Sequence, residues 1–456
     1  MENHLKVAKF GGTSMRDLQA MQSCAGIVAD DPARKVVIVS ATAGTTDQLT
    51  ELCEAHSLDR KEELLKQIEI RHLELAVQTG PENNAYPGIK EMLIELRSYV
   101  HGVNEVTAAE RDYILSFGER LSSSLFANVL SKMVDGVVWL DVKDILLTDD
   151  FHGKAEPQLE EIANRALKKL KPLLENGLVV SQGFIGSTLD GKTTTLGRGG
   201  SDYSAALFAE ALSADILEIW TDVAGIFSTD PGIVPDAHPI EELNFNEAAE
   251  LAIYGAKVLH PATLKTAIRK NTRVFVGKSM DPQAGGTWIS QKTGSAPNIR
   301  GISIRRNQKL ITIHSLDMVH QFGFLARIFE VLARHKTSVD LVSTSEVNVS
   351  LTLDTGIQSN YSNRMLDNAI EELRTFSTVH IESDLSLVAV IGNKLNQTPG
   401  ISGKIFNSLR DINIRMVCHG ASPHNLCFLV NDRDGDRSIR LIHKQFLTQP
   451  KKEEVL

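Results

Sequence analysis

The sequence predicts an α/β protein in which a sheet with parallel strands is followed by a pair of small α+β modules. Two observations predict the α/β part: the apolar stretches at residues 5–10 and 35–40 each lead into a small, polar turn and then a helical pattern. This order is typical of parallel strands joined by helical crossovers. The third observation is an internal repeat beyond residue 298, which predicts the two modules.

Composition narrows the classes of function. The chain has 456 residues, enough for two or three domains, and a formal net charge of −9, which argues against nucleic acid or an anionic membrane as main partner. The four cysteines lack zinc-ligand spacing, so we expect reduced thiols and no protein-bound metal site. No signal-peptide pattern opens the chain and no apolar run approaches the roughly 18 residues of a membrane span, so we expect a cytoplasmic protein.

The first strand and turn predict an anion cradle. The strand expected at residues 5–10 carries Lys9 near its end and leads into Gly11-Gly12-Thr13-Ser14, then into a helical pattern that reaches Val28. Glycines let successive backbone N–H groups face one concavity, and a helix N-terminus adds the positive end of its dipole. Lys9 would add a charge to this cradle; the alternative is a lysine on an edge strand whose ammonium reaches water.

The second strand and turn repeat the arrangement. A strand at residues 35–40 leads into the hydroxyl-bearing turn Ala41–Thr46 and another helix. Open α/β sheets bind ligands at the carboxyl ends of their parallel strands. The two turns together therefore predict a polar crevice at that edge of the sheet.

Three long helices are expected next, at residues 59–78, 88–106 and 108–128. The first two carry many charges, which predicts solvated faces. The third contains Glu119, whose carboxylate would matter for function only if it faces the crevice; the alternative is an ordinary exposed helix acid. Strands are expected at residues 136–140 and 177–182.

The most polar stretch is the glycine-rich turn Thr193–Asp202, which runs into a helix at residues 203–212. Its glycines allow backbone N–H groups to converge, and Arg198 offers a planar fork for a carboxylate or a phosphate. An anion site is one interpretation and a tight turn with a helix N-cap is the other. The spacing matches neither a P-loop nor a dinucleotide fingerprint.

A strand at residues 215–221 ends in a polar run from Thr221 and Asp222 to Asp230. These hydroxyls and carboxylates suit a ribose or a hydrated magnesium ion, and the alternative is an Asx turn. A helix at residues 246–259, a strand at 272–277 and a linker at 278–298, rich in Gly, Pro, Ser and Thr, complete this region.

Beyond that linker the chain repeats itself. The segment Gly323–Phe329 matches Gly400–Phe406, 77 residues further along, and the register continues without gaps to Leu351 and Phe428. Each copy has the pattern strand, glycine loop, helix, strand, strand. The clustered polar chemistry of the first half is absent from both copies, so the repeat predicts a ligand-sensing module rather than a second active site.

These stretches together resemble an aspartate kinase of the amino-acid-kinase superfamily, in its monofunctional, lysine-sensitive type. The resemblance rests on Lys9–Ser14, Thr193–Asp202, Glu247–Glu250 and Gly255–Pro261, followed by paired modules similar to ACT domains. It implies a mainly parallel sheet sandwiched by helices, then two ferredoxin-like α+β ACT modules. It also implies transfer of the γ-phosphoryl group of ATP, with Mg²⁺, to the side-chain carboxylate of L-aspartate, the first step of lysine, threonine and methionine synthesis.

The resemblance implies roles for individual residues. Lys9 and Asp202 would be catalytic. Arg198 would take the α-carboxylate of aspartate and Glu119 its α-ammonium, and the substrate-binding set would be Thr46, Glu119, Arg198, Gly199, Gly200 and Ser201. The ATP-binding set would be Lys9, Gly11, Gly12, Ser14, Thr221, Asp222, Phe227, Asp230 and Lys257. Phe227 departs from the tyrosine expected at its position.

Lysine would be the inhibitor, bound in the ACT region. The residues that match the family's effector site are Met318, Gly323, Phe324, Leu325, Ser338, Val339, Asp340, Ser345 and Glu346. Asp340 and Glu346 would meet the ammonium groups of lysine; the alternative makes them loop carboxylates at a dimer surface. Paired ACT modules imply a homodimer or a higher assembly.

The domain organisation follows from the linker and the repeat. The catalytic domain would span residues 1–292 and the regulatory region 293–449, with 450–456 as a tail. The first ACT module, about 315–384, would be inserted between the strands of the second, about 299–314 plus 385–449. Two other functions stay open: a kinase of the same fold that acts on another amino acid or carboxylate, and a catalytically silent amino-acid sensor.

Overall fold

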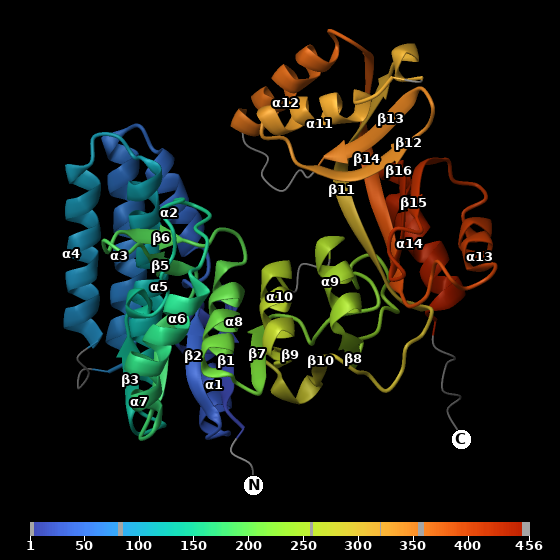
Figure 1. Cartoon of the computed structure of the whole chain (residues 1–456). Coiled ribbons are helices and arrows are strands. Elements are labelled where there is room, and N and C mark those ends of the chain that lie inside the picture. Colours follow the sequence, from blue (N-terminus) through green and yellow to red (C-terminus); the bar gives the residue numbers. More distant parts are fainter. Residues whose placement is uncertain (1–3, 81–84, 256–258, 320, 354–359, 449–456) are drawn as a thin grey trace, which may run out of the picture. The chain divides into compact units, whose positions relative to one another are not determined.

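Two large sheets organise the chain, one in each of two units (Figure 1). The computed structural model describes residues 4–80, 85–255, 259–319, 321–353 and 360–448. The first unit is Met1–Ile226 with Pro239–Ala249 and Lys257–Gly294, and the second is Phe227–His238 with Glu250–Ala256 and Ser295–Leu456. In the described part of the chain, none of the helices has both the length and the apolar character that crossing a membrane requires.

The first sheet is mainly parallel, as predicted. Its strand order is β3-β4-β2-β1-β7-β9-β10-β8, and every neighbouring pair is parallel except β9 and β10. The strands are β1 (Lys6–Phe10), β2 (Arg34–Val39), β3 (Val137–Leu140), β4 (Leu178–Gln182), β7 (Ile216–Thr221), β8 (Glu242–Asn244), β9 (Arg273–Lys278) and β10 (Gly286–Ser290). A separate hairpin is formed by β5 (Ile185–Ser187) and β6 (Thr193–Thr195).

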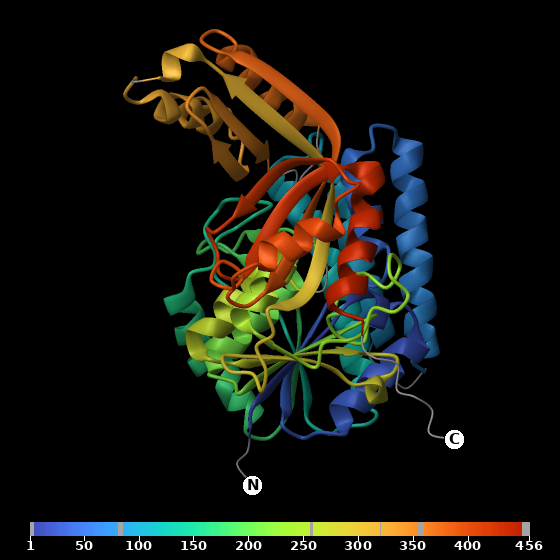
Figure 2. The same cartoon turned by 90° about the vertical axis from the view of Figure 1, so that its right-hand side faces the viewer.

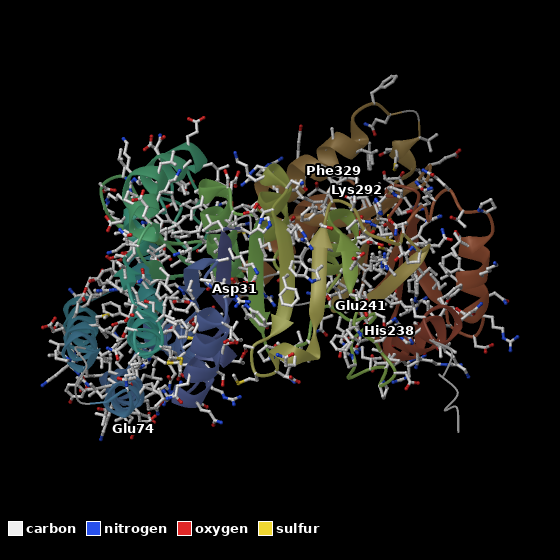
Figure 3. All side chains as sticks on the ribbon, turned by 90° about the horizontal axis from the view of Figure 1, so that it is seen from below. Asp31, Glu74, His238, Glu241, Lys292 and Phe329 are labelled. Atoms are coloured by element: carbon white, nitrogen blue, oxygen red, sulfur yellow. The ribbon has the colours of Figure 1, made fainter. Side chains whose placement is uncertain are left out.

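Helices join these strands. They are α1 (Leu18–Ala29), α2 (Thr45–Glu54), α3 (Leu58–Gln78), α4 (Ala85–Gly102), α5 (Ala108–Leu130), α6 (Leu159–Arg165), α7 (Lys171–Leu174), α8 (Gly200–Leu212), α9 (Phe245–Ile253) and α10 (Pro261–Lys270). Side-chain caps define several starts; the side chain of Thr107 forms a capping box with Glu110 at the start of α5. Asp31, labelled in Figure 3, follows α1 and pairs with Lys6 Nζ at 2.7 Å, which ties the end of this helix to β1.

Successive side chains of β1 and β2 point to opposite faces of the sheet, and the two faces pack against different helices. Ala8, Phe10, Val37 and Val39 belong to one core with apolar side chains of α1, α3 and α5. Lys9 points to the opposite face, where α8 contacts β1, β2 and β7. Helices therefore cover both faces of the sheet, which confirms the predicted fold class.

The linker expected at residues 278–298 is wrong for part of its length. Strand β10 lies inside it and joins the first sheet, with Thr287 and Ile289 buried. The strand is only five residues long, so its alternating pattern of buried side chains is a weak signal in the sequence, and the Gly, Pro and Ser residues around it suggest a linker. The helix expected at residues 246–259 also differs: α9 ends at Ile253, and His260 is the N-cap of α10.

The second sheet is antiparallel, with strand order β12-β13-β11-β14-β16-β15 (Figure 2). Its strands are β11 (Ile299–His314), β12 (Val339–Thr344), β13 (Asn348–Leu353), β14 (Thr378–Gly392), β15 (Ile414–His419) and β16 (Asn425–Asn431). Its helices are α11 (Phe324–Arg334), α12 (Asn360–Leu373), α13 (Ile401–Ser408) and α14 (Asp432–Phe446). The long strands β11 and β14 pair along most of their length.

The structure confirms the repeat as two α+β copies with separate cores. One core gathers Ile311 and Ile313 of β11 with side chains of α11, α12 and β13, and the other gathers Ile302 with side chains of α13, α14 and β16. The matching glycines are structurally equivalent. Gly323 and Gly400 are the N-caps of α11 and α13 with φ of 80° and 76°, a left-handed conformation that favours glycine.

Candidate active site

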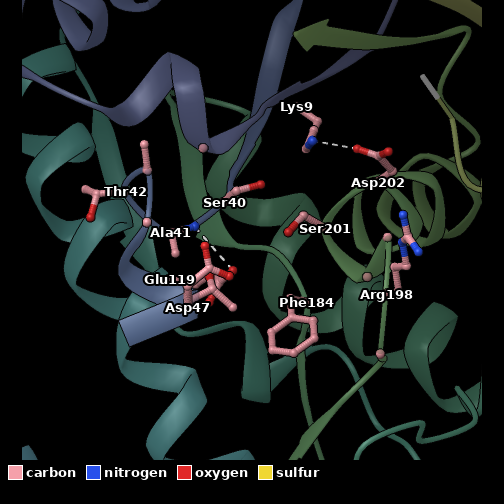
Figure 4. Close-up of a pocket in the computed structure, with 17 residues that line it drawn as sticks. Lys9, Ser40, Ala41, Thr42, Asp47, Glu119, Phe184, Arg198, Ser201 and Asp202 are labelled. Carbon is pink, nitrogen blue, oxygen red and sulfur yellow. Dashed lines mark hydrogen bonds and ion pairs between the residues drawn. The ribbon is translucent and has the colours of Figure 1, made fainter. Parts of the chain in front are cut away.

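Two cavities of about 410 Å³ and 420 Å³ lie at the carboxyl ends of β1 and β2, and Figure 4 shows the first. The first is lined by the turn at residues 40–47 without its buried Thr45, by Glu119 and Phe184, and by residues 197–202. The second is lined by residues 11–13 and by Ile219, Thr221 and Asp222 of the neighbouring strand β7 and its end. Both cavities share Lys9, Gly12, Ala43, Gly44 and Asp202, so they meet along one wall.

Lys9 and Asp202 form an ion pair on that shared wall. Lys9 Nζ lies 2.6 Å from Asp202 Oδ1, and the two side chains point toward each other in Figure 4. The contact has the distance of an ion pair without the angles of a hydrogen bond, and the Lys9 side chain is only 10% exposed. The edge-strand alternative for Lys9 is wrong, because β1 lies between β2 and β7 in the middle of the sheet.

Glu119 is a buried carboxylate that faces the first cavity. It is 4% exposed on α5, and its Oε1 accepts a hydrogen bond from Ala41 N at 3.2 Å. Its Oε2 is buried without a hydrogen-bond partner among the described residues. Burial raises the pKa of this carboxyl to about 8. The alternative of an exposed helix acid is therefore wrong, and an ammonium in the cavity would give Oε2 the partner it lacks.

The glycine-rich turn presents Arg198 at the other side of this cavity. Gly197 and Gly199 have φ of 75° and 72°, and α8 begins at Gly200. A Cβ on Gly199 would lie 2.6 Å from the Cβ of His260, so only glycine fits there. The turn is tight and ends in the N-cap of α8, as the second interpretation has it, but the N-cap is Gly199 and neither Ser201 nor Asp202 caps the helix with its side chain. Arg198 is exposed, and its guanidinium has no hydrogen bond or ion pair within the described chain.

The residues expected around ATP are only partly brought together. Gly11, Gly12, Thr221 and Asp222 line the second cavity, where Thr221 Oγ1 donates to Asp222 Oδ1 at 3.1 Å. Ser14 lines neither cavity, because its buried hydroxyl donates to Ser279 Oγ at 2.7 Å.

The remaining ATP candidates lie outside the first unit or outside the described residues. Phe227 and Asp230 belong to the second unit. Asp230 Oδ1 accepts from Gly232 N at 2.8 Å, which is the Asx turn raised as the alternative. Lys257 lies outside the described residues.

The effector candidates lie around α11 and β12. Gly323 caps α11, Phe324 is buried and Leu325 is exposed, while Met318 precedes the helix. Asp340 lies within strand β12, so it is not a loop carboxylate, and its Oδ2 pairs with Arg305 Nη1 at 2.7 Å. Val339 begins the same strand and Ser338 directly precedes it, and Ser345 and Glu346 lie exposed between β12 and β13.

Sequence reasoning missed Phe184. This residue lies between β4 and β5 with φ of 67°, lines the first cavity, and would contact a Cβ placed on Gly200 at 2.8 Å. The flanking Gly183 and Gly186 mark a turn there, but a positive φ at a phenylalanine has no sequence signal.

Comparison with known proteins assigns the family. Residues 4–278 match the amino acid kinase family, and residues 311–356 and 388–446 match an ACT domain. Lysine-sensitive aspartokinase 3 of Escherichia coli (strain K12) is 46% identical over 97% of this chain and 99% of its own length. The chain belongs to the aspartokinase family.

Two crystal structures of E. coli aspartokinase III are similar to this chain along almost its whole length. The complex with aspartate and ADP, in the R-state, has a TM-score of 0.88 at 45% identity and covers 96% of this chain and 99% of its own. The complex with lysine and aspartate, in the T-state, has a TM-score of 0.79 at 44% identity, with coverages of 97% and 99%. The catalytic and regulatory halves of an aspartokinase are thus both present.

Proposed function

We propose that the protein transfers the γ-phosphoryl group of ATP to the side-chain carboxylate of L-aspartate, giving 4-phospho-L-aspartate, and that L-lysine inhibits this reaction. The observation that carries the proposal is one cavity lined by Lys9, Glu119, Arg198 and Asp202. Glu119 and Arg198 offer opposite charges to the ammonium and carboxylate of an amino acid. The Lys9–Asp202 pair lies where a second carboxylate of the substrate could react. The family relationship and the ligands of its solved relatives support the same reaction.

The two α-substituents of aspartate carry opposite charges, and the cavity offers a partner for each. The guanidinium of Arg198 suits the α-carboxylate, and the buried Oε2 of Glu119 suits the α-ammonium. Thr46 and Ser201 add hydroxyls, and Gly199 adds a backbone N–H group at the start of α8. Gly200 lines the same cavity, with its own N–H donated to Gly197 O. With both α-groups held, the side-chain carboxylate is directed toward Lys9.

The chemistry needs positioning and charge stabilisation more than proton transfer. A side-chain oxygen of aspartate bonds to the γ-phosphorus while the bond from that phosphorus to the β-γ bridging oxygen breaks, and ADP leaves. A carboxyl with a pKa of about 3.9 is already ionised at neutral pH, so no general base is required. Lys9 and the backbone N–H group of Gly12 would stabilise the charge on the transferring group, since the N–H of Gly11 donates to Trp220 O.

ATP would occupy the second cavity beside Gly11, Gly12, Thr221 and Asp222. Lys257 stays a proposed contact of ATP, whereas the hydroxyl of Ser14 is turned toward Ser279. Among the described residues no three His, Cys, Asp or Glu side chains gather into a metal site. Mg²⁺ is commonly bound through substrate phosphates and one or two carboxylates, and here Asp202 and Asp222 would hold it. When bound, Mg²⁺ would neutralise phosphate charge.

The regulatory proposal concerns the second unit. Lysine would bind among the residues of its effector set, with Glu346 and Asp340 near its ammonium groups, and ACT modules at the proposed boundaries would pair in a homodimer or a higher assembly. Apolar side chains exposed on this unit support such pairing: Leu316, Phe322, Leu325 and Phe329.

A hydroxamate assay tests the proposal. The full chain is incubated with ATP, Mg²⁺, L-aspartate and hydroxylamine, with lysine, threonine or methionine added separately. We expect hydroxamate from aspartate and suppression by lysine alone. Activity without a lysine effect would contradict the effector assignment. A folded protein without aspartate activity would point to another acceptor or to a silent sensor.

A further inference from the structure

We infer that Asp112 is a positioning residue for the site of the substrate α-carboxylate, an inference that rests on the proposed function. Asp112 lies on α5 and lines neither cavity. It is fully buried, and its carboxylate is contacted by hydrogen-bond donors of two segments next to the glycine-rich turn, residues 152–153 and Thr195. The following contacts connect it to Arg198.

Two segments donate to this carboxylate. Asp112 Oδ1 accepts from Thr195 Oγ1 at 2.6 Å, and Oδ2 accepts from Thr195 N at 3.1 Å. Oδ2 also accepts from Gly153 N at 3.0 Å and contacts His152 Nδ1 at 2.9 Å. A buried carboxylate is costly unless donors surround it, so these donors are held firmly where the carboxylate is.

Both segments support the turn that carries Arg198. Thr195 ends β6, three residues before Arg198, and its carbonyl oxygen accepts from Ala155 N at 2.9 Å. Gly197 packs so closely on the other segment that a Cβ there would lie 3.1 Å from Gly153 O. The guanidinium of Arg198 has no anchor of its own within the described chain, so the backbone that Asp112 holds decides where it lies.

The same helix carries the other charge of the substrate site. Glu119 follows Asp112 by seven residues on α5, about two helical turns, so the two carboxylates share a face. One rigid helix therefore presents the partner of the α-ammonium directly and holds the partner of the α-carboxylate through Thr195 and Gly153. The spacing between the two protein groups that would bind the substrate charges therefore depends on this helix.

A matched pair of variants at Thr195 tests the inference without removing a buried charge. Thr195→Val keeps the shape and loses the hydroxyl, whereas Thr195→Ser keeps the hydroxyl. We expect Thr195→Val to raise KM for aspartate about tenfold, the usual effect of losing one hydrogen bond to a charged group. KM for ATP should stay unchanged, and Thr195→Ser should resemble the wild type. Asp112→Asn should have a larger effect in the same direction if it folds.

A double-mutant cycle separates positioning from general destabilisation. In an Arg198→Ala background Thr195→Val should add little, because the group that it positions is gone, whereas in a Thr46→Ala background its effect should be retained in full. Three results would overturn the inference. Thr195→Val could leave KM for aspartate unchanged, or raise KM for ATP by the same factor. It could also raise KM for aspartate by as large a factor in the Arg198→Ala background as in the wild type. A wild-type chain inactive with aspartate would instead overturn the proposed function, before any variant is compared.

Discussion

At the scale of single residues, Glu119 predicts how substrate binding depends on pH. Burial raises its pKa to about 8 in the empty site, so much of the protein has this carboxyl protonated at pH 7. Binding the α-ammonium of aspartate favours the carboxylate, so binding releases a proton. We expect KM for aspartate to fall as pH rises from 6 to about 8 and then to level off. Steady-state kinetics across this range measures the effect.

Glu119→Gln provides the comparison. The variant should bind aspartate at least about tenfold more weakly, because a buried charged partner is lost, and its KM should no longer change over this pH range. The raised pKa of Glu119 also predicts how the stability of the fold depends on pH. A carboxyl raised from 4.5 to about 8 binds more protons folded than unfolded, so the unliganded wild type loses stability as pH rises through this interval. Thermal unfolding in which both proteins show the same pH dependence would contradict the assignment.

At the scale of elements, α3 holds the turn at the start of α2. Arg71 Nη1 donates to Ala43 O at 2.5 Å, and the buried His72 contacts Ile68 O through Nδ1 and Thr42 Oγ1 through Nε2 at 3.1 Å. The carbonyl requires Nδ1 to donate, so Nε2 accepts from the Thr42 hydroxyl. Burial lowers the pKa of His72 to about 4, so its ring is neutral in this network at physiological pH.

His72→Phe should destabilise the protein by about 1–3 kcal/mol in urea unfolding at pH 7, because it removes two buried hydrogen bonds of the ring, with Thr42 Oγ1 and Ile68 O. A histidine whose pKa falls from 6.5 to about 4 on folding contributes stability that is lost as pH falls through that range. The variant should therefore lose less stability than the wild type between pH 6.5 and 4. His56→Phe, at an exposed position, is the matched control, and its stability should depend on pH as that of the wild type does.

At the scale of the whole molecule, regulation requires that lysine bind two conformations with different affinities. Glu346 is exposed between β12 and β13, whereas Asp340 is already paired with Arg305. We expect Glu346→Ala to weaken lysine inhibition at least about tenfold, as the loss of a charged hydrogen bond would, with uninhibited turnover nearly unchanged. Glu330→Ala, another exposed carboxylate of the same module, should leave inhibition intact. Equal lysine inhibition of Glu346→Ala and wild type would remove Glu346 from the effector site.

Much of the candidate site could be predicted from local sequence because its chemistry lies in turns. Gly12, Gly197, Gly199 and Gly200 have backbone conformations or close approaches that few other residues allow, and such turns are visible in sequence. Their position at the ends of parallel strands follows from the alternation of strand and helix. The fold class and the repeat marked by Gly323 and Gly400 could be predicted for the same reason, because short periodic patterns in the sequence indicate both, and the structure confirms them.

The α/β class, the polar turns and the paired α+β copies could all be predicted from the sequence, since period and turn chemistry are local properties. Folding was needed to show that Lys9 lies on a central strand opposite Asp202, that Glu119 is buried and that Ser14 is turned away toward Ser279. Strand order and burial depend on contacts between residues far apart in the chain. Asp112 shows this most clearly, because only folding brings it into contact with its hydrogen-bond partners His152, Gly153 and Thr195.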